Sequence, residues 1–106
     1  MARDDSSREK IVIHADIDLE DLIPGFLGNQ SRDAVKIKSL LDSGDYESIQ
    51  RMGHSMRGSG GGYGFDEITN IGARIEQAAI DRNRSEILRQ VEGLLRYLDC
   101  IEVVYD

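Results

Sequence analysis

The chain of 106 residues has a formal net charge of −7 at pH 7, with 40% apolar and 31% charged residues. This length suits one domain with one hydrophobic core. The acidic charge argues against nucleic acid or an anionic membrane as a partner.

The sequence shows no feature of secretion or membrane insertion. Cys100 is the only cysteine, so the fold needs no oxidising compartment and we expect a reduced structural thiol. No apolar run reaches the roughly 18 residues needed to cross a bilayer, and residues 1–10 lack the apolar centre of a signal peptide. We therefore expect a cytoplasmic protein that is a monomer and does not bind membranes.

The two ends of the chain differ in character from its middle. Residues 1–10 are polar and of mixed charge, so they should form a flexible tail ahead of a single domain over residues 11–106. Ile11–Ile13 and Glu102–Tyr105 are short β-branched runs, too short to stand alone as strands. We expect these two segments to pair as a two-stranded ribbon.

Apolar residues recur at helical spacing in four segments between the two extended runs. Short polar connections separate the segments, and the chain has one proline. An antiparallel up-down four-helix bundle, an all-α fold, is the simplest way to bury four such stripes. The predicted core positions are Leu22, Ile23, Phe26, Leu27, Ala34, Ile37, Leu40 and Leu41, then Ile49, Met52, Met56 and Gly60, then Phe65, Ile68, Ile71, Gly72, Ile75, Ala78 and Ala79, and finally Ile87, Val91, Leu94, Leu98 and Ile101.

Specific residues mark the ends of these helices. The first pattern starts at Leu19, and Pro24 either kinks that helix or opens its second part. Gly44 fits a left-handed C-terminal cap and Asp45 fits the next N-cap. Ser85 or Asn83 should be the N-cap of the last helix.

His54 lies on the exposed side of the second predicted helix. With Ile49 at 0° and 100° per residue, Met56 falls at about 340° and His54 at about 140°. Arg57, Gly58 and Gly61 share the face of His54, at offsets of three, four and seven residues. Glycine at the last two positions should keep the space around the imidazole open.

The other glycines of this stretch have different expected roles. Gly53 and Gly60 fall on the buried side, where the absence of a side chain lets helices approach closely. Gly62 and Gly64 should end the helix and turn the chain into the next one.

An exposed, accessible imidazole suits phosphoryl transfer. Neutral imidazole is a good nucleophile near pH 7, and in-line transfer needs open space opposite the phosphoryl donor. Arg57 is one turn away and would offset the charge of the phosphoryl oxygens. The competing interpretation of His54 is a solvated surface histidine beside a flexible helix end.

The segment His54–Phe65 resembles the motif of the histidine phosphotransfer (HPt) domains of two-component phosphorelays. That motif has a basic residue, a glycine and a second glycine at offsets of three, four and ten from the histidine, where Arg57, Gly58 and Gly64 stand. The resemblance extends from about Leu19 to Ile101. It implies that His54 is the phosphorylated residue and that Arg57 lies near the phosphoryl group.

The resemblance also implies partners. The phosphoryl group would come from the aspartate of one response-regulator receiver domain, such as that of a hybrid sensor histidine kinase, and pass to another. The chain itself would need no cofactor, since Mg²⁺ would belong to the receiver. Leu22 or Phe26 on the first helix would contribute to docking. Arg57 departs from the usual lysine, so the rate or partner preference of transfer is expected to differ.

Two other kinds of site are rejected. The glycine run has no Gly-Lys-Ser/Thr and lies at a helix C-terminus, where the dipole repels phosphate, so we expect no ATP-dependent kinase activity of the protein's own. No His or Cys pair has metal-ligand spacing, and His14 should be a surface or strand-end residue. The remaining alternative is a non-catalytic bundle that binds a receiver or another partner without carrying phosphate.

Charged and aromatic residues outside the motif have structural interpretations. The acidic residues before the first helix lack the glycine and glutamate of a Ca²⁺ loop and should complement the dipole of that helix. They are Asp16, Asp18, Glu20 and Asp21. Arg82 and Arg84 are expected to be solvated loop residues, and Tyr105 to pack at one end of the bundle.

Overall fold

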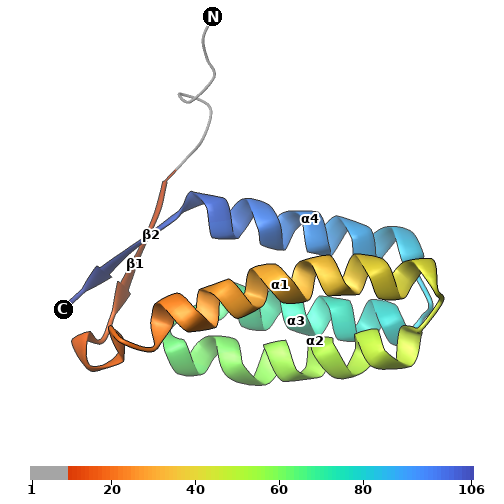
Figure 1. Cartoon of the computed structure of the whole chain (residues 1–106), viewed down its shortest axis with the longest axis horizontal. Coiled ribbons are helices and arrows are strands. Elements are labelled where there is room, and N and C mark those ends of the chain that lie inside the picture. Colours follow the sequence, from red (N-terminus) through yellow and green to blue (C-terminus); the bar gives the residue numbers. More distant parts are fainter. Residues whose placement is uncertain (1–9) are drawn as a thin grey trace, which may run out of the picture.

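Within residues 10–106, which are the residues that the structure describes, four α-helices lie side by side along the long axis of the computed structural model (Figure 1). The predicted tail over residues 1–10 lies outside this described part except for Lys10. The chain direction reverses from each helix to the next (Figure 1). The elements are β1 (Ile11–Ala15), a 3₁₀ turn (Ile17–Leu19), α1 (Ile23–Asp42), α2 (Tyr46–Gly60), a second 3₁₀ turn (Gly61–Tyr63), α3 (Asp66–Ile80), α4 (Arg84–Cys100) and β2 (Ile101–Tyr105).

The helix α1 begins later than the apolar pattern predicts. Pro24 lies in its first turn, where the fixed φ and the missing N–H of proline are tolerated. The chain before it forms a 3₁₀ turn, in which the side chain of Asp16 accepts a hydrogen bond from the Asp18 N–H at 2.9 Å. The first turn of α1 contains no acidic residue, and Asp21 directly precedes its N-cap Leu22, so the acidic segment lies ahead of the helix.

The connection between α1 and α2 follows the predicted capping chemistry. Gly44 has φ of +71°, a backbone conformation that glycine adopts without steric cost. The Asp45 side chain accepts a hydrogen bond from the Ser48 N–H at 3.1 Å and from the Ser48 hydroxyl at 2.7 Å. These bonds hold the pKa of Asp45 below its usual range. The chain therefore reverses over about two residues.

The connection between α3 and α4 differs from the prediction in the contacts of Arg84. Asn83 is the N-cap of α4, and its side chain accepts from the Glu86 N–H at 3.2 Å. Arg84 is not simply solvated, because its guanidinium donates to the Leu41 carbonyl at 2.9 Å. The same carbonyl, in the last turn of α1, also accepts from the Gly44 N–H at 3.0 Å, so Arg84 is a second donor at this helix end. The Arg82 guanidinium lies 5.7 Å from the centre of the Tyr46 ring.

The core is built mainly from the predicted apolar positions. Six core positions were predicted in α3 and a seventh at Phe65, the residue before it. All seven are buried. In α4 the last buried position is Tyr97 rather than Leu98, and Ile101 has already left the helix for β2. In α1 Leu22 is exposed, whereas Gln30, which no apolar pattern would include, is buried.

The two extended segments pair as a parallel two-stranded sheet. Ile11 lies opposite Ile101, and the register continues to Ala15 opposite Tyr105. The sheet is at the end of the bundle where α1 begins and α4 ends (Figure 1). One face of the sheet packs against the core, with Ala15 buried and Tyr105 half-buried.

Glycines bring the backbones of α2 and α3 into direct contact. A Cβ atom on Gly72 would lie 2.5 Å from the backbone nitrogen of Arg57. A Cβ on Gly53 would lie 2.6 Å from the backbone nitrogen of Glu76, and one on Gly60 would lie 2.6 Å from that of Thr69. No side chain fits at these three positions without separating the helices.

We therefore expect Gly72→Ala to destabilise the fold by about 1–3 kcal/mol, because the added methyl group overpacks the contact between α2 and α3. Urea unfolding followed by circular dichroism measures this change. Gly58→Ala is the matched control, since a Cβ there meets nothing within 4 Å. The control should be more stable than wild type by up to about 1 kcal/mol. Equal stability of Gly72→Ala and wild type would contradict the close contact.

Candidate functional site

His54 stands in the middle of α2 with its side chain 69% exposed. The neighbouring positions that anchor α2 are buried, namely Ile49, Gly53 and Met56. Since successive helical residues are 100° apart, burying these three turns His54 toward solvent. The imidazole therefore lies on the face that the helical angles predicted.

Glu76 of α3 holds the imidazole from one side. Its Oε2 atom is 3.0 Å from Nδ1 of His54, and its Oε1 atom accepts a hydrogen bond from Arg57 at 2.9 Å. The Glu76 side chain is only 15% exposed, so this carboxylate is partly desolvated and its two bonds are worth more than at an open surface. One carboxylate thus fixes both the histidine and the basic residue of the motif.

This contact determines the tautomer of the ring. An ionised carboxylate only accepts hydrogen bonds, so Nδ1 of His54 must carry the hydrogen. In the neutral ring Nε2 then keeps its lone pair. The nitrogen that is free of Glu76 is therefore the nucleophilic one.

Glu76 is the site residue that sequence reasoning missed. Helical periodicity predicts core positions on both sides of it, at Ile75 and Ala78, but gives Glu76 itself no role. Its position four residues after Gly72, on the side of α3 that contacts α2, is the feature that could have identified it. Residues four apart lie on the same side of a helix, so a glutamate at this position can reach from α3 to α2.

The two glycines expected to clear space around His54 have different surroundings. At Gly58 the space is open. Gly61 lies in the 3₁₀ turn after α2, and a Cβ there would point toward the Thr69 hydroxyl at 3.5 Å. Its N–H donates to the same hydroxyl at 2.8 Å. A side chain at Gly61 would therefore contact Thr69 of α3, whereas one at Gly58 would meet open space.

The glycine turn after α2 is fixed by aromatic packing. Gly64 has φ of +92° and caps the 3₁₀ turn. The ring of Phe26 stacks on Tyr63 at 4.3 Å and on Phe65 at 5.8 Å between centroids. Phe26 is consequently 8% exposed, so its expected contribution to docking is wrong. Leu22 is 55% exposed and stays available for such a contact.

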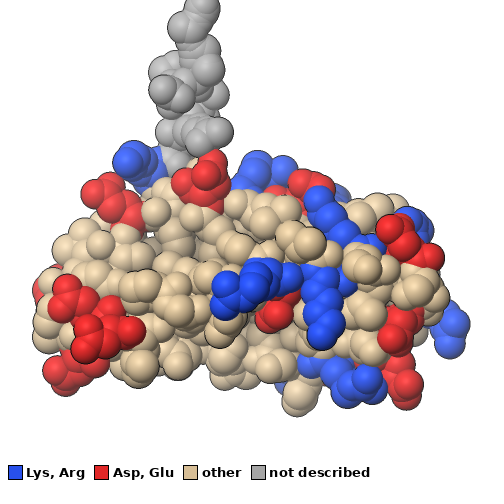
Figure 2. Space-filling model, in the orientation of Figure 1, with Lys and Arg blue, Asp and Glu red and all other residues tan. Residues whose placement is uncertain are grey.

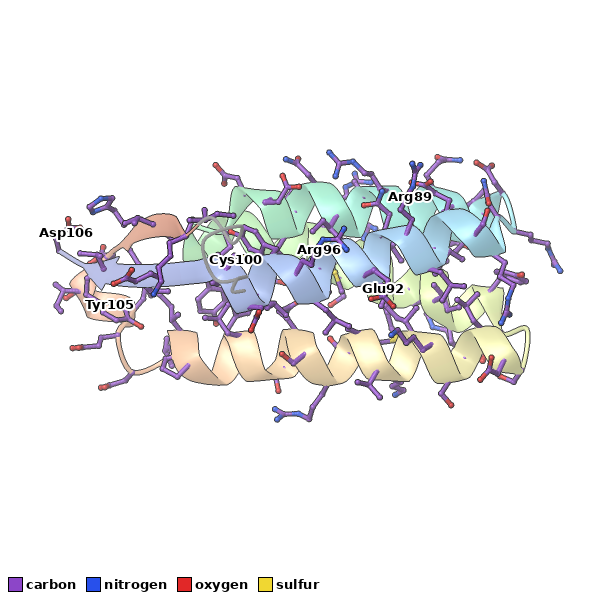
Figure 3. All side chains as sticks on the ribbon, turned by 90° about the horizontal axis from the view of Figure 1, so that it is seen from above. Arg89, Glu92, Arg96, Cys100, Tyr105 and Asp106 are labelled. Atoms are coloured by element: carbon purple, nitrogen blue, oxygen red, sulfur yellow. The ribbon has the colours of Figure 1, made fainter. Side chains whose placement is uncertain are left out.

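The remaining candidate residues lie elsewhere. Nδ1 of His14 is 2.9 Å from Oδ2 of Asp106, just beyond β2 (Figure 3). Cys100 is half-buried in the last position of α4. Among residues 10–106 there is no group of three His, Cys, Asp or Glu side chains that could hold a metal ion. No helix in this described part of the chain is long and apolar enough to span a membrane.

The comparison with family models assigns most of the chain to one family. Residues 21–102 match the model of the Hpt domain, and the chain belongs to that family. The match contains all four helices and therefore His54, Arg57 and Glu76. No curated protein and no solved structure matches the chain.

Replacing Glu76 with alanine should remove the preference of neutral His54 for the tautomer with its hydrogen on Nδ1. In the wild type, ¹⁵N NMR of histidine-labelled protein should show neutral His54 with its hydrogen on Nδ1. In Glu76→Ala the ring should shift toward the tautomer mixture of an unpartnered imidazole. His14 is the internal control, since its partner is Asp106. A His54 spectrum that does not change would contradict the hydrogen bond.

Proposed function

We propose that the protein is a phosphorelay intermediate that accepts a phosphoryl group on His54 from a receiver-domain aspartate and passes it to another receiver. The family acts in phosphotransfer in two-component signalling, and its members work with receiver domains. The observation that carries the proposal is the exposed His54 ring whose Nδ1 is bound to Glu76 at 3.0 Å. This arrangement directs the lone pair of Nε2 toward an incoming donor.

The chemistry follows from this geometry. Nε2 gives its electron pair to the phosphorus of the aspartyl phosphate, and the bond between phosphorus and the carboxylate oxygen breaks with its electrons on that oxygen. The ring becomes cationic during this step. The Glu76 carboxylate at Nδ1 stabilises that positive charge. Transfer to a second aspartate is the reverse reaction.

Gly58 and Arg57 complete the proposed site. The open space at Gly58 lets a receiver domain approach the ring, and Arg57 adds a positive charge near the phosphoryl oxygens. Arg57 is already bound to Glu76, so it also keeps that carboxylate in place. Leu22 would extend the docking surface, and Mg²⁺ would be supplied by the receiver. The partners would include a hybrid sensor kinase, and the protein would act as a cytoplasmic monomer.

The alternative function is a bundle that binds a receiver through this face without carrying phosphate. The bond between His54 and Glu76 favours transfer, because a docking residue needs no fixed tautomer. A partly buried carboxylate aimed at Nδ1 has a clear use in activating a nucleophile.

Phosphotransfer to His54 is tested with a ³²P-labelled phosphorylated receiver domain. Wild type should take up an acid-labile, base-stable label, as expected for phosphohistidine, and His54→Gln should take up none. His14→Gln is the matched control, because it removes the other histidine and should retain the label. Equal labelling of wild type and His54→Gln would refute the proposal.

Gly58→Glu tests the open approach. The new side chain would occupy the space in front of the ring, and its charge would repel the phosphoryl group. We expect label transfer from the receiver to slow by about tenfold or more, with the helical circular dichroism spectrum unchanged. Gly58→Ala should lose much less activity. Loss of helical structure in Gly58→Glu would instead place this residue in the core.

A further inference from the structure

A hollow of about 400 Å³ borders His54 on the side of the preceding helical turn. Gln50, Arg51, His54 and Glu76 line it. Helical side chains lean toward the N-terminus of their helix, so the imidazole extends over the turn that contains Gln50 and Arg51. Arg57, on the other side of the ring, does not line this space.

The two arginines that flank His54 differ in their partners. Arg57 is bound to the Glu76 carboxylate at 2.9 Å, so one negative charge already offsets its positive charge. Arg51 donates to the neutral hydroxyl of Ser48 at 3.2 Å, and among residues 10–106 it forms no ion pair within 4.0 Å. Ser48 in turn donates to Asp45 at 2.7 Å, and the charges of Arg51 and Asp45 interact. Arg51 therefore brings to the hollow a positive charge that is held in no ion pair among the described residues.

A phosphoryl group on His54 would change the charge balance of the site. The group carries up to two negative charges near pH 7, and Arg57 and Glu76 together are neutral. Figure 2 shows acidic side chains at both ends of the bundle, and Glu76, which lines the hollow itself, is bound to Arg57. The positive charge that is free to meet the phosphoryl group is that of Arg51.

We propose that Arg51 binds the phosphoryl group carried by His54 across the hollow that both side chains line. This inference rests on the proposed function and assigns a second cationic residue to the same site. Arg51 is exposed, and its bond to a neutral hydroxyl is easily exchanged for a stronger, charge-assisted bond to phosphate. Its planar guanidinium can donate hydrogen bonds to two phosphoryl oxygens at once.

The test uses the full chain and phosphoramidate as a small phosphoryl donor, so that no receiver surface is involved. Nε2 of His54 bonds to phosphorus, the P–N bond of phosphoramidate breaks, and ammonia leaves with the electrons of that bond and takes up a proton. The variants are Arg51→Gln, Arg51→Lys and the control Arg96→Gln. Arg96 lies on α4 (Figure 3), and its replacement changes the net charge by the same amount.

The first readout is the ³¹P chemical shift of phosphorylated His54 as a function of pH. A guanidinium beside the phosphoryl group favours its dianion, so Arg51→Gln should raise the pH at which the phosphoryl group titrates. Arg51→Lys should restore most of the wild-type behaviour, and Arg96→Gln should match wild type. The second readout is the rate of phosphorylation, which should fall by about three- to tenfold in Arg51→Gln.

The outcomes separate this inference from the proposed function. If His54 is phosphorylated but Arg51→Gln and Arg96→Gln titrate at the same pH, the role of Arg51 is wrong and the phosphorelay proposal stands. If neither phosphoramidate nor a phosphorylated receiver labels His54 in the wild type, both proposals fail. A slower rate in Arg51→Gln without a change in the ³¹P titration would also overturn the direct contact.

Discussion

The direct contact between the backbones of α2 and α3 is the constraint on which the site depends. Gly53 and Gly72 allow this approach, since a Cβ atom at either position would come within 2.6 Å of the opposite helix. Only at this separation does a glutamate on α3 reach the imidazole of α2 at 3.0 Å. The buried glycines therefore serve the chemistry indirectly, by setting the distance between a carboxylate and a nucleophile.

The glycine-rich end of α2 combines several separate requirements. Gly60 is needed for helix contact, Gly64 for a left-handed turn and Gly58 for open space beside the ring. These are different physical reasons for the same residue type. Packing, backbone conformation and access are thus concentrated within seven residues of one helix end, and Phe26 stabilises the turn through its contact with Tyr63.

Local features of the sequence predicted most of the fold. Helical periodicity identified the core of α3, and the capping residues Gly44 and Asp45 marked the turn between α1 and α2, because these depend on neighbours within about one helical turn. The role of Arg84 was missed, since its partner is the carbonyl of Leu41, 43 residues away. Which residues meet across the bundle depends on the packing of whole helices.

The same distinction applies to the candidate site. The exposure of His54 followed from helical angles alone. The bond to Glu76 could not be predicted in this way, because it requires the relative position of α2 and α3. The surroundings of Gly61 likewise depend on α3, because the hydroxyl that its N–H meets belongs to Thr69.

The parallel pairing of β1 and β2 has a consequence for how this domain can be connected. Because the strands are parallel, Ile11 lies beside Ile101, whereas Asp106 lies beside Ala15 at the opposite end of the sheet. The described start of the chain and its end therefore share one end of the bundle but leave the small sheet at opposite ends, and His54 lies away from both, in the middle of α2. Polypeptide attached at either side would join the domain at this sheet and leave the middle of α2 uncovered at its points of attachment.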